Sequence, residues 1–229
     1  EDTRVTAKLL AIHGISRPLV AYHEHNAKRG RPGLIKRLKK GETVALVSDA
    51  GTPLISDPGF KLVRACLEEE IPVTPLPGAS SVLAAMVVSG LPTDRFFFAG
   101  FLPPKSSARR RALGEIAEIP GSLVFMESAK RLAASLADMA DVLGDREAVI
   151  AREMTKIFED VRRGPLAGLA ALYGGQNPPK GEVSIIVAPF SRPGVDDAEL
   201  DRRLTEAMKS ATLRDAADGV SAATGIPRR

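Results

Sequence analysis

The sequence has 229 residues, of which 44% are hydrophobic and 26% charged, and its formal net charge is +4. These proportions are ordinary for a globular protein, and the length permits one large domain or two small ones. The single cysteine, Cys66, excludes an intrachain disulfide, and His13, His23 and His25 lack the spacing of a zinc site, so we expect no metal. No apolar run reaches about 18 residues, so we expect a cytoplasmic protein without a membrane segment.

The N-terminal part of the sequence alternates between short apolar strands and helices. Strands are predicted over residues 43–48 and near Val73. Helices are predicted over residues 34–40, 60–67 and 82–88. This order predicts a parallel sheet with helices on its faces.

A break at G-L-P-T (residues 90–93) marks a domain boundary. We therefore expect an N-terminal α/β domain over 1–92, a C-terminal α/β domain over 93–190 and a helical tail over 191–229. The second domain is predicted to hold strands over 95–101, 122–127, 147–152 and 182–188, with helices over 106–116, 130–143 and 166–172, in a partly antiparallel sheet. After a linker over 189–193, helices over 196–209 and 212–224 allow a helix-turn-helix-like unit, and Thr212 and Asp215 have capping-box-like spacing.

A polar loop follows the first predicted strand and reads S-D-A-G-T-P-L-I-S-D-P-G over residues 48–59. Open α/β sheets bind ligands at the carboxyl ends of their strands, where Asp and Thr suit ribose hydroxyls or an amino group. The alternative is an elaborate turn whose Asp and Thr side chains cap their own neighbours. We favour ligand binding, because a tight connection needs far fewer residues.

Two further segments have open interpretations. In P-G-A-S-S (residues 77–81), backbone N–H groups at a helix start are suited to a carboxylate, and Ser80 or Ser81 equally suits a plain N-cap. In A-R-E-M-T-K (residues 151–156), two cations and an acid at a strand end favour structural ion pairing, with orientation of an anionic substrate as the alternative. The sequence contains no P-loop, no G-x-G-x-x-G after a strand and no G-x-S-x-G elbow.

Basic residues gather in two stretches without acids. Seven Lys or Arg lie between His25 and Gly41, and Lys105, Arg109, Arg110 and Arg111 form a second cluster. Such runs are either solvated helix faces or phosphate contacts.

Taken together, several segments resemble the rRNA-methylating branch of the tetrapyrrole methylase superfamily. The matching pieces, in order along nearly the whole chain, are E-D-T-R (1–4), Y-H-E-H-N (22–26), the 47–59 loop, P-G-A-S-S (77–81), F-A-G-F-L-P (98–103), F-M-E-S (125–128) with Arg131, A-R-E-M-T-K (151–156) and K-G-E (180–182). The combination of S-D-A-G-T-P-L-I-S-D-P-G with P-G-A-S-S and G-F-L-P-P-K is specific to this group.

The resemblance implies two α/β domains with S-adenosylmethionine in the cleft between them. It also implies methyl transfer to the ribose 2′-hydroxyl of a cytidine in the decoding region of 16S rRNA in the small ribosomal subunit, by a homodimer that needs no metal. The implied cofactor contacts are Asp49, Gly51, Thr52, Ile55, Ser80, Ser81, Met126, Ala151, Gly181, Glu182 and Val183.

The roles of charged residues follow from residue type and family position. Asp2, Glu24 and Glu127 are candidates for a general base, while Arg152 and Lys156 are candidates for lowering the pKa of the hydroxyl. With an RNA substrate, the basic stretches become candidate RNA contacts, namely Arg29, Arg31, Lys105, Arg109, Arg110 and Arg111.

One departure from the family concerns the first strand. The family begins with a strand and a T-P-I-G-N-type loop upstream of E-D-T-R, whereas this sequence starts at Glu1. We therefore expect an exposed sheet edge and an inactive chain as written. Two alternative functions remain: a C-methylase acting on a polycarboxylate tetrapyrrole, and a non-catalytic ribosome-assembly factor that binds RNA.

Overall fold

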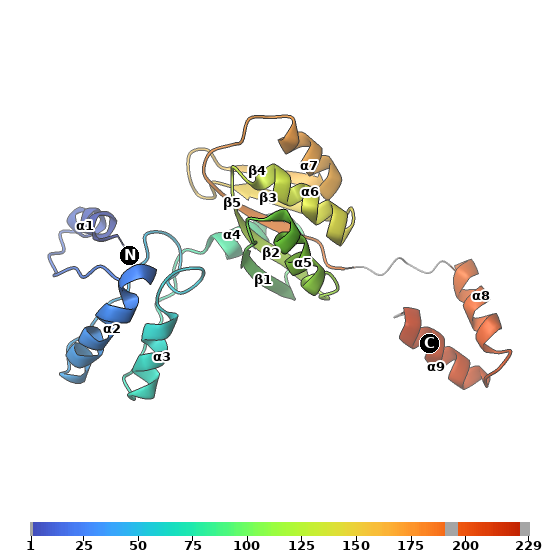
Figure 1. Ribbon diagram of the computed structural model, residues 1–229, viewed down its shortest axis with the longest axis horizontal. Coiled ribbons are helices and arrows are strands. Elements are labelled where there is room, and N and C mark those ends of the chain that lie inside the picture. Colours follow the sequence, from blue (N-terminus) through green and yellow to red (C-terminus); the bar gives the residue numbers. More distant parts are fainter. Residues whose placement is uncertain (1, 191–196, 225–229) are drawn as a thin grey trace.

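The structure is a computed structural model that describes residues 2–190 and 197–224 (Figure 1). Most of the linker expected over 189–193 therefore lies outside the described residues, as does the end of the predicted tail.

A five-stranded sheet with the order β1-β2-β5-β3-β4 forms the centre of the protein (Figure 1). Its strands are β1 (Phe96–Phe101), β2 (Ser122–Ser128), β3 (Glu147–Arg152), β4 (Asp160–Pro165) and β5 (Glu182–Val187). Only β1 and β2 run parallel, and the other three pairs are antiparallel, which confirms the expected mixed sheet. The sequence did not reveal β4, because its D-V-R-R-G-P segment carries the charges typical of an edge strand.

One face of the sheet carries the larger hydrophobic core. It is covered by α5 (Ser106–Ile116), α6 (Leu132–Leu143) and α7 (Leu166–Gly174). Phe125, Leu136 and Ile185 are fully buried there. These helices are close to the predicted ranges, because their apolar spacing follows the helical period.

The opposite face is covered by α4 (Ser81–Ser89), which comes from the N-terminal half of the chain. Val82 and Met86 pack there against Val124 and Ile186. Alternate residues of each strand therefore enter different cores, as the pleat requires. Because α4 is so placed, the loop that precedes it lies beside the ends of β2 and β5.

Three more helices belong to the N-terminal half, α1 (Thr3–Ile12), α2 (Glu24–Lys39) and α3 (Phe60–Glu68). A small core of Tyr22, Leu34, Leu62 and Cys66 joins α2 to α3. Helix α2 begins well before the predicted residue 34, since Asn26 Oδ1 accepts a hydrogen bond from His23 N at 2.9 Å and defines its start. The prediction missed this turn because Gly30, Pro32 and Gly33 interrupt the helical pattern.

The strands predicted over 43–48 and near Val73 are wrong. In the described part of the chain both segments are extended, but neither has a hydrogen-bonded neighbouring strand. Val44 and Leu46 are half-buried against the small core, while Ala45 and Val47 are exposed. Apolar composition indicates a tendency to be buried, but a strand also needs a partner for its backbone.

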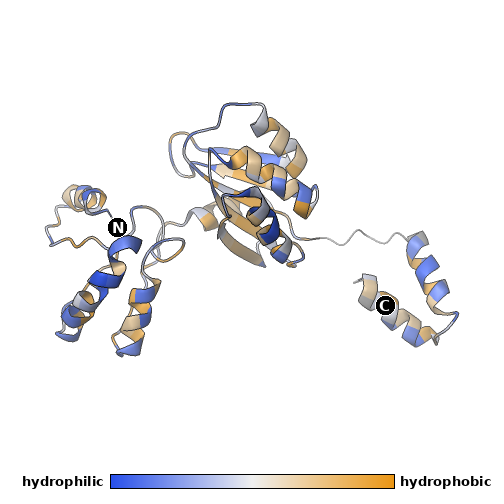
Figure 2. Ribbon diagram, viewed as in Figure 1, coloured by the Kyte–Doolittle hydropathy of each residue, from blue (hydrophilic) through white to orange (hydrophobic). Residues whose placement is uncertain are grey.

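The tail contains α8 (Asp197–Ala207) and α9 (Leu213–Thr224), which lie side by side (Figure 1). Thr212 Oγ1 accepts a hydrogen bond from Asp215 N at 3.3 Å and donates one to Asp215 Oδ2 at 2.7 Å. The predicted start of the last helix is therefore confirmed. Figure 2 shows that α2, α5 and much of α8 are hydrophilic, whereas hydrophobic residues concentrate in the sheet and in α4, α6 and α7.

Two of the four residues in the second basic cluster, Arg109 and Arg110, are paired with acids from another helix. Arg109 is 4% exposed, and its Nε donates to Asp138 Oδ2 on α6 at 2.6 Å. Arg110 donates to Asp141 Oδ2 at 2.6 Å. The predicted RNA contact is therefore wrong for Arg109, whose guanidinium is buried, and the sequence hid this because its partner lies 29 residues away. Lys105 at the start of α5 and Arg111 within α5 are both exposed, so their role in RNA contact stays a prediction.

Arg109→Met should lower the free energy of unfolding by about 3 to 5 kcal/mol, because Asp138 would keep a buried charge without its main partner. Burial would raise the pKa of Asp138, but hydrogen bonds from Arg109 and Ser106 hold that pKa below its ordinary 3.8. The pair's contribution should therefore be complete above about pH 4 and be lost as the pH falls further. Denaturant unfolding at several pH values measures this, with Arg111→Met as the exposed control. Equal losses in both variants would contradict the assignment.

Candidate active site

A pocket of about 230 Å³ brings together both loops singled out in the sequence and the ends of three strands. Its lining residues are Asp49, Ala50, Gly51, Thr52, Ile55, Ser56, Asp57, Ser80, Ser81, Val82, Phe101, Met126 and Glu182. The pocket thus combines carboxylates, hydroxyls and a helix start with apolar side chains.

Hydrogen bonds hold the two loops together. Thr52 Oγ1 donates to the carbonyl oxygen of Ala79 at 2.9 Å, which joins the 48–59 loop to the P-G-A-S-S segment. Within the first loop, Ser48 hydrogen-bonds to Asp57. Leu54 and Ser56 adopt positive φ values of 73° and 60°, a conformation that costs a non-glycine residue free energy. The loop is therefore a constrained structure, not merely a connection.

Ser80 resolves the alternatives left open for the second loop. It is the N-cap of α4, since its Oγ accepts a hydrogen bond from Leu83 N at 3.3 Å. Ser80 and Ser81 also line the pocket, so capping and pocket lining are properties of the same residues.

Most of the predicted cofactor residues line this pocket, namely Asp49, Gly51, Thr52, Ile55, Ser80, Ser81, Met126 and Glu182. Three others do not. Ala151 is buried beneath α4, and the Val183 side chain points into the core on the opposite face of the sheet. Gly181 packs against Glu153, where an added Cβ would lie 2.3 Å from the carboxylate.

Val82 and Phe101 also line the pocket, although neither was expected from the sequence as a cofactor contact. The signal for Phe101 was its position at the end of a strand within the G-F-L-P motif. Val82 read as an ordinary core residue of the following helix, which it also is.

Glu127 lies on the opposite face of β2 from the pocket and is 3% exposed. Its Oε1 accepts hydrogen bonds from Arg131 Nε and Ser128 N, each at 2.7 Å, and its Oε2 accepts one from Ser135 Oγ at 2.6 Å. This carboxylate joins β2 to α6 and is directed away from the pocket. The placement gives it a structural role and does not support the predicted role of base.

Glu127→Gln should lower the free energy of unfolding by about 2 to 4 kcal/mol, because the amide presents a donor to Arg131 or Ser135 inside a buried hydrogen-bond network and leaves the half-buried Arg131 without its ionic partner. Thermal and denaturant unfolding measure the loss, with the exposed Glu118→Gln as control. A variant of wild-type stability that has lost methyl transfer would instead restore Glu127 as a chemical participant.

A second pocket of about 470 Å³ adjoins the first at Asp49. Its lining residues are Asp2, Thr3, Arg4, Ala21, His23, His25 and Asp49. Asp2 N donates to Asp49 Oδ1 at 2.9 Å, which ties the start of α1 to the first loop.

The histidines of this second pocket were considered in the sequence only as metal ligands. Their rings lie edge to face with centroids 6.0 Å apart. The candidate base Glu24 is the first residue of α2 and lies between the two histidines in the sequence. Unlike them, it is not among the residues that line this pocket. The relevant signal was the Y-H-E-H-N motif as a whole, and the placement of Glu24 outside the pocket lining does not support its predicted role as base.

Asp2 is tightly engaged by a neighbour. Arg4 Nε and its terminal nitrogen donate to the two carboxylate oxygens, at 3.0 Å to Oδ1 and 2.6 Å to Oδ2. These side-chain hydrogen bonds, with one from Arg4 N, lower the pKa of Asp2 to about 2. A carboxylate with so low a pKa is a weak proton acceptor, so its arrangement suits orientation better than base catalysis.

Lys156 forms the ion pairs that the sequence favoured for its segment. Its Nζ donates to Glu182 Oε2 at 2.9 Å and to Glu153 Oε1 at 3.0 Å, and these bonds raise the pKa of Lys156. Arg152 donates to the carbonyl oxygen of Lys180 at 3.3 Å. Neither cation lines the two pockets, so their predicted action on a hydroxyl group has no support from placement.

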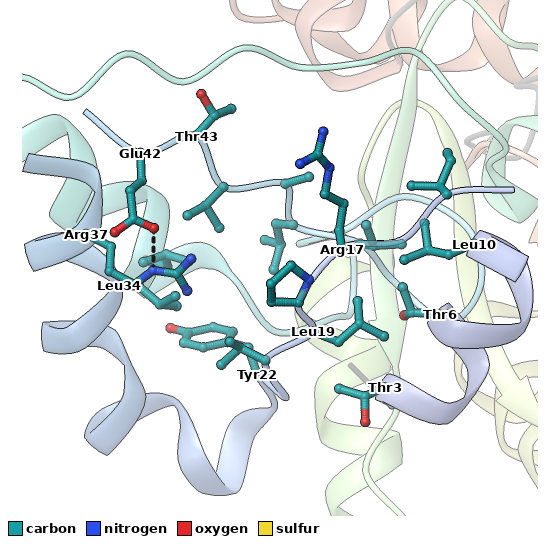
Figure 3. A pocket seen from close by; sticks show the side chains of 18 residues that line it. Thr3, Thr6, Leu10, Arg17, Leu19, Tyr22, Leu34, Arg37, Glu42 and Thr43 are labelled. Carbon is teal, nitrogen blue, oxygen red and sulfur yellow. Dashed lines mark hydrogen bonds and ion pairs between the residues drawn. The ribbon is translucent and has the colours of Figure 1, made fainter. Parts of the chain in front are cut away.

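A third pocket, of about 770 Å³, was not predicted (Figure 3). It lies between the extended residues 42–47 and residues 15–22, and the Tyr22 ring and Leu19 face into it. Arg37 and Glu42 at its edge pair with each other at 2.8 Å. Its lining is mostly apolar, whereas carboxylates and hydroxyls line much of the 230 Å³ pocket.

Within residues 2–190 and 197–224, no cluster of three or more His, Cys, Asp or Glu is arranged to hold a metal ion. In the same ranges no helix is both long and apolar enough to span a membrane.

Comparison with known proteins identifies the family. The model of the family described as tetrapyrrole (corrin/porphyrin) methylases matches residues 3–170. The chain belongs to this family. It is also 46% identical over 226 residues to the ribosomal RNA small subunit methyltransferase I of Mesorhizobium japonicum, an alignment covering 98% of this chain and 77% of that protein.

Solved structures confirm the tetrapyrrole methylase fold. Diphthine synthase superposes with a TM-score of 0.60 at 15% identity, covering 80% of this chain and 73% of that one. The uroporphyrin-III C-methyltransferase of Thermus thermophilus, solved with S-adenosyl homocysteine, superposes with a TM-score of 0.50 at 20% identity, covering 72% and 75%. Methyltransferases of this family use S-adenosylmethionine.

The residues of the 230 Å³ pocket fit this cofactor chemically. Carboxylates such as Asp49 suit ribose hydroxyls, and the start of α4 at Ser81 suits the carboxylate of the methionine part. Met126 and Phe101 offer an apolar wall for a base or for the methylene groups. When bound, S-adenosylmethionine supplies an electrophilic methyl group.

Thr52→Val should weaken S-adenosylmethionine binding about 5-fold, because the hydrogen bond that joins the two loops is lost. Thr52→Ser keeps the hydroxyl and should bind like the wild type. Isothermal titration calorimetry with S-adenosylmethionine compares the three proteins. Wild-type affinity in Thr52→Val would show that the joined loops do not shape the cofactor site.

Proposed function

We propose that the protein transfers the methyl group of S-adenosylmethionine to the ribose 2′-hydroxyl of a cytidine in the decoding region of 16S rRNA. The observation that carries the proposal is the high identity, over nearly the whole chain, to proteins named ribosomal RNA small subunit methyltransferase I. Structural likeness to tetrapyrrole and diphthine enzymes at 15–20% identity supports only the fold.

The geometry supports an acceptor position next to the cofactor. The 230 Å³ and 470 Å³ pockets share Asp49, so an acceptor in the second pocket would lie beside a cofactor in the first. Methyl transfer needs the acceptor oxygen in line with the bond that breaks, and holding that alignment supplies much of the rate. Asp49 and the Asp2–Arg4 pair are placed to fix this alignment.

The second pocket also contains groups suited to take the hydroxyl proton. A ribose hydroxyl is a weak nucleophile, and a positioned imidazole is the commonest general base. His23 is half-buried and His25 exposed in this pocket. In the proposal one of the two imidazoles would accept the hydroxyl proton while the ribose oxygen bonds to the methyl carbon, and the sulfur–methyl bond would break to leave S-adenosylhomocysteine.

The association of two copies and the cytoplasmic location remain part of the proposal. Exposed apolar residues on α1 support self-association, since Val5, Leu9 and Ile12 follow one another at helical spacing and are 43%, 47% and 79% exposed.

Methylation of small ribosomal subunits from a strain lacking the modification tests the proposal, with nucleosides read by mass spectrometry. We expect a new 2′-O-methylcytidine in unmodified subunits and none in subunits that already carry it. Replacing His23 and His25 singly by Gln should lower the single-turnover rate about 100-fold at one of them.

Each other outcome has a distinct meaning. Saturable S-adenosylmethionine binding without transfer to RNA would overturn the RNA proposal and direct attention to polycarboxylate tetrapyrroles. RNA binding without cofactor binding would indicate a non-catalytic assembly factor. Transfer at wild-type rate in both histidine variants would remove the imidazoles from the mechanism but leave the substrate assignment intact.

A further inference from the structure

The turn that joins β3 to β4 presents two neighbouring apolar side chains to solvent. Ile157 is 95% exposed and Phe158 is 71% exposed. A lone exposed apolar residue needs no explanation, but an adjacent pair at the tip of a turn marks a candidate contact surface. Neither residue lines any of the pockets described above.

The turn is held in one conformation by its own hydrogen bonds. Lys156 N donates to the Glu153 carbonyl oxygen at 3.0 Å, and Thr155 N donates to Glu159 Oε2 at 2.6 Å. Glu153 and Thr155 adopt positive φ values of 50° and 66°. Non-glycine residues persist in this conformation only where the surroundings impose it, and such sites cluster at ligand contacts. The exposed pair is therefore presented by a preorganised turn.

The same turn is joined to the cofactor pocket. Glu153 Oε1 accepts hydrogen bonds from Glu182 N at 2.9 Å and from Lys156 Nζ at 3.0 Å. Lys156 Nζ also donates to Glu182 Oε2, and the Glu182 side chain lines the pocket. The absence of a side chain at Gly181 makes this packing possible, because a Cβ there would lie 2.3 Å from Glu153. Phe158 is two residues from a side chain that contacts the pocket wall.

The charges near the turn are balanced and do not exclude a polyanionic partner. Lys156 pairs with both Glu153 and Glu182, and Arg162 pairs with Asp160. The exposed Lys180 and the half-exposed Arg152 offset the remaining negative charge, which includes the exposed Glu159. An exposed aromatic ring is the group that binds unpaired nucleotides, since the ring stacks on a base whatever its sequence.

We infer that Phe158, backed by Ile157, stacks on an unpaired base of the RNA substrate at the rim of the cofactor pocket. This inference rests on the proposed function and names the residue that positions the RNA. Stacking at the rim fixes the strand while the target ribose occupies the neighbouring pocket, so Phe158 acts by positioning and takes no part in the chemistry.

Phe158→Ala should weaken binding of unmodified small subunits about 10-fold or more, because base–aromatic stacking is lost. The slope of log affinity against log salt should stay unchanged, since no charge is removed. Phe158→Tyr keeps the ring and should restore binding. Phe60→Ala is the matched control, because Phe60 is 64% exposed on α3 and lines none of the pockets.

Fluorescence anisotropy with labelled subunits gives the affinities, single-turnover methylation gives the rates, and calorimetry with S-adenosylmethionine verifies the fold of each variant. If Phe158→Ala binds subunits as tightly as the wild-type protein, the inference about Phe158 is overturned. The proposed function stands in that case as long as the wild-type protein methylates the subunits. If Phe158→Ala changes the sedimentation of the protein but not its affinity for RNA, Ile157 and Phe158 form a contact between two copies of the chain. That result would also overturn the inference. A wild-type protein that neither binds nor methylates subunits would overturn both proposals.

Discussion

Both faces of the β2–β5–β3 sheet have to be covered, and helices of the C-terminal half cover only one of them. The other face is covered by α4, which follows the P-G-A-S-S loop in the N-terminal half. Because Val82 and Met86 are fixed on Val124 and Ile186, Ser80 and Ser81 lie next to Met126 and Glu182. The candidate cofactor pocket thus results from hydrophobic burial on the second face.

Ion pairs around the sheet hold the scaffold of this site. The carboxylate of Glu127 joins β2 to α6, and Arg109 joins α5 to the same helix through Asp138. Both carboxylates and Arg109 are buried, where an unpaired charge would be costly, so these residues are committed to their partners. The residues left around the pocket are mainly hydroxyls, carboxylates of a constrained loop and apolar side chains, which suit binding more than nucleophilic chemistry. This is the composition expected where catalysis depends on alignment.

Backbone strain is concentrated at the two segments that meet the pocket. Leu54 and Ser56 in the first loop, and Glu153 and Thr155 in the β3–β4 turn, all adopt positive φ values. Apart from Glu70, these are the only non-glycine residues with positive φ in the described part of the chain. Glu70 ends α3, where a left-handed residue is an ordinary helix terminator. The other four occur where the chain must present particular groups to a ligand or substrate.

The sequence by itself determined most of the C-terminal half, both pocket loops and the family. Helical and strand periodicities are local properties, and the S-D-A-G-T-P-L-I-S-D-P-G loop is recognisable because its residues are consecutive. The tertiary structure decided which charges are available. It paired Arg109 with an acid far along the chain, turned Glu127 to the opposite face from the pocket, and placed His23 and His25 instead of Glu24 in the second pocket. It also left residues 43–48 extended without a neighbouring strand among the described residues. Composition indicates which residues tend to be buried or charged, but partners distant in sequence are fixed only when the chain packs.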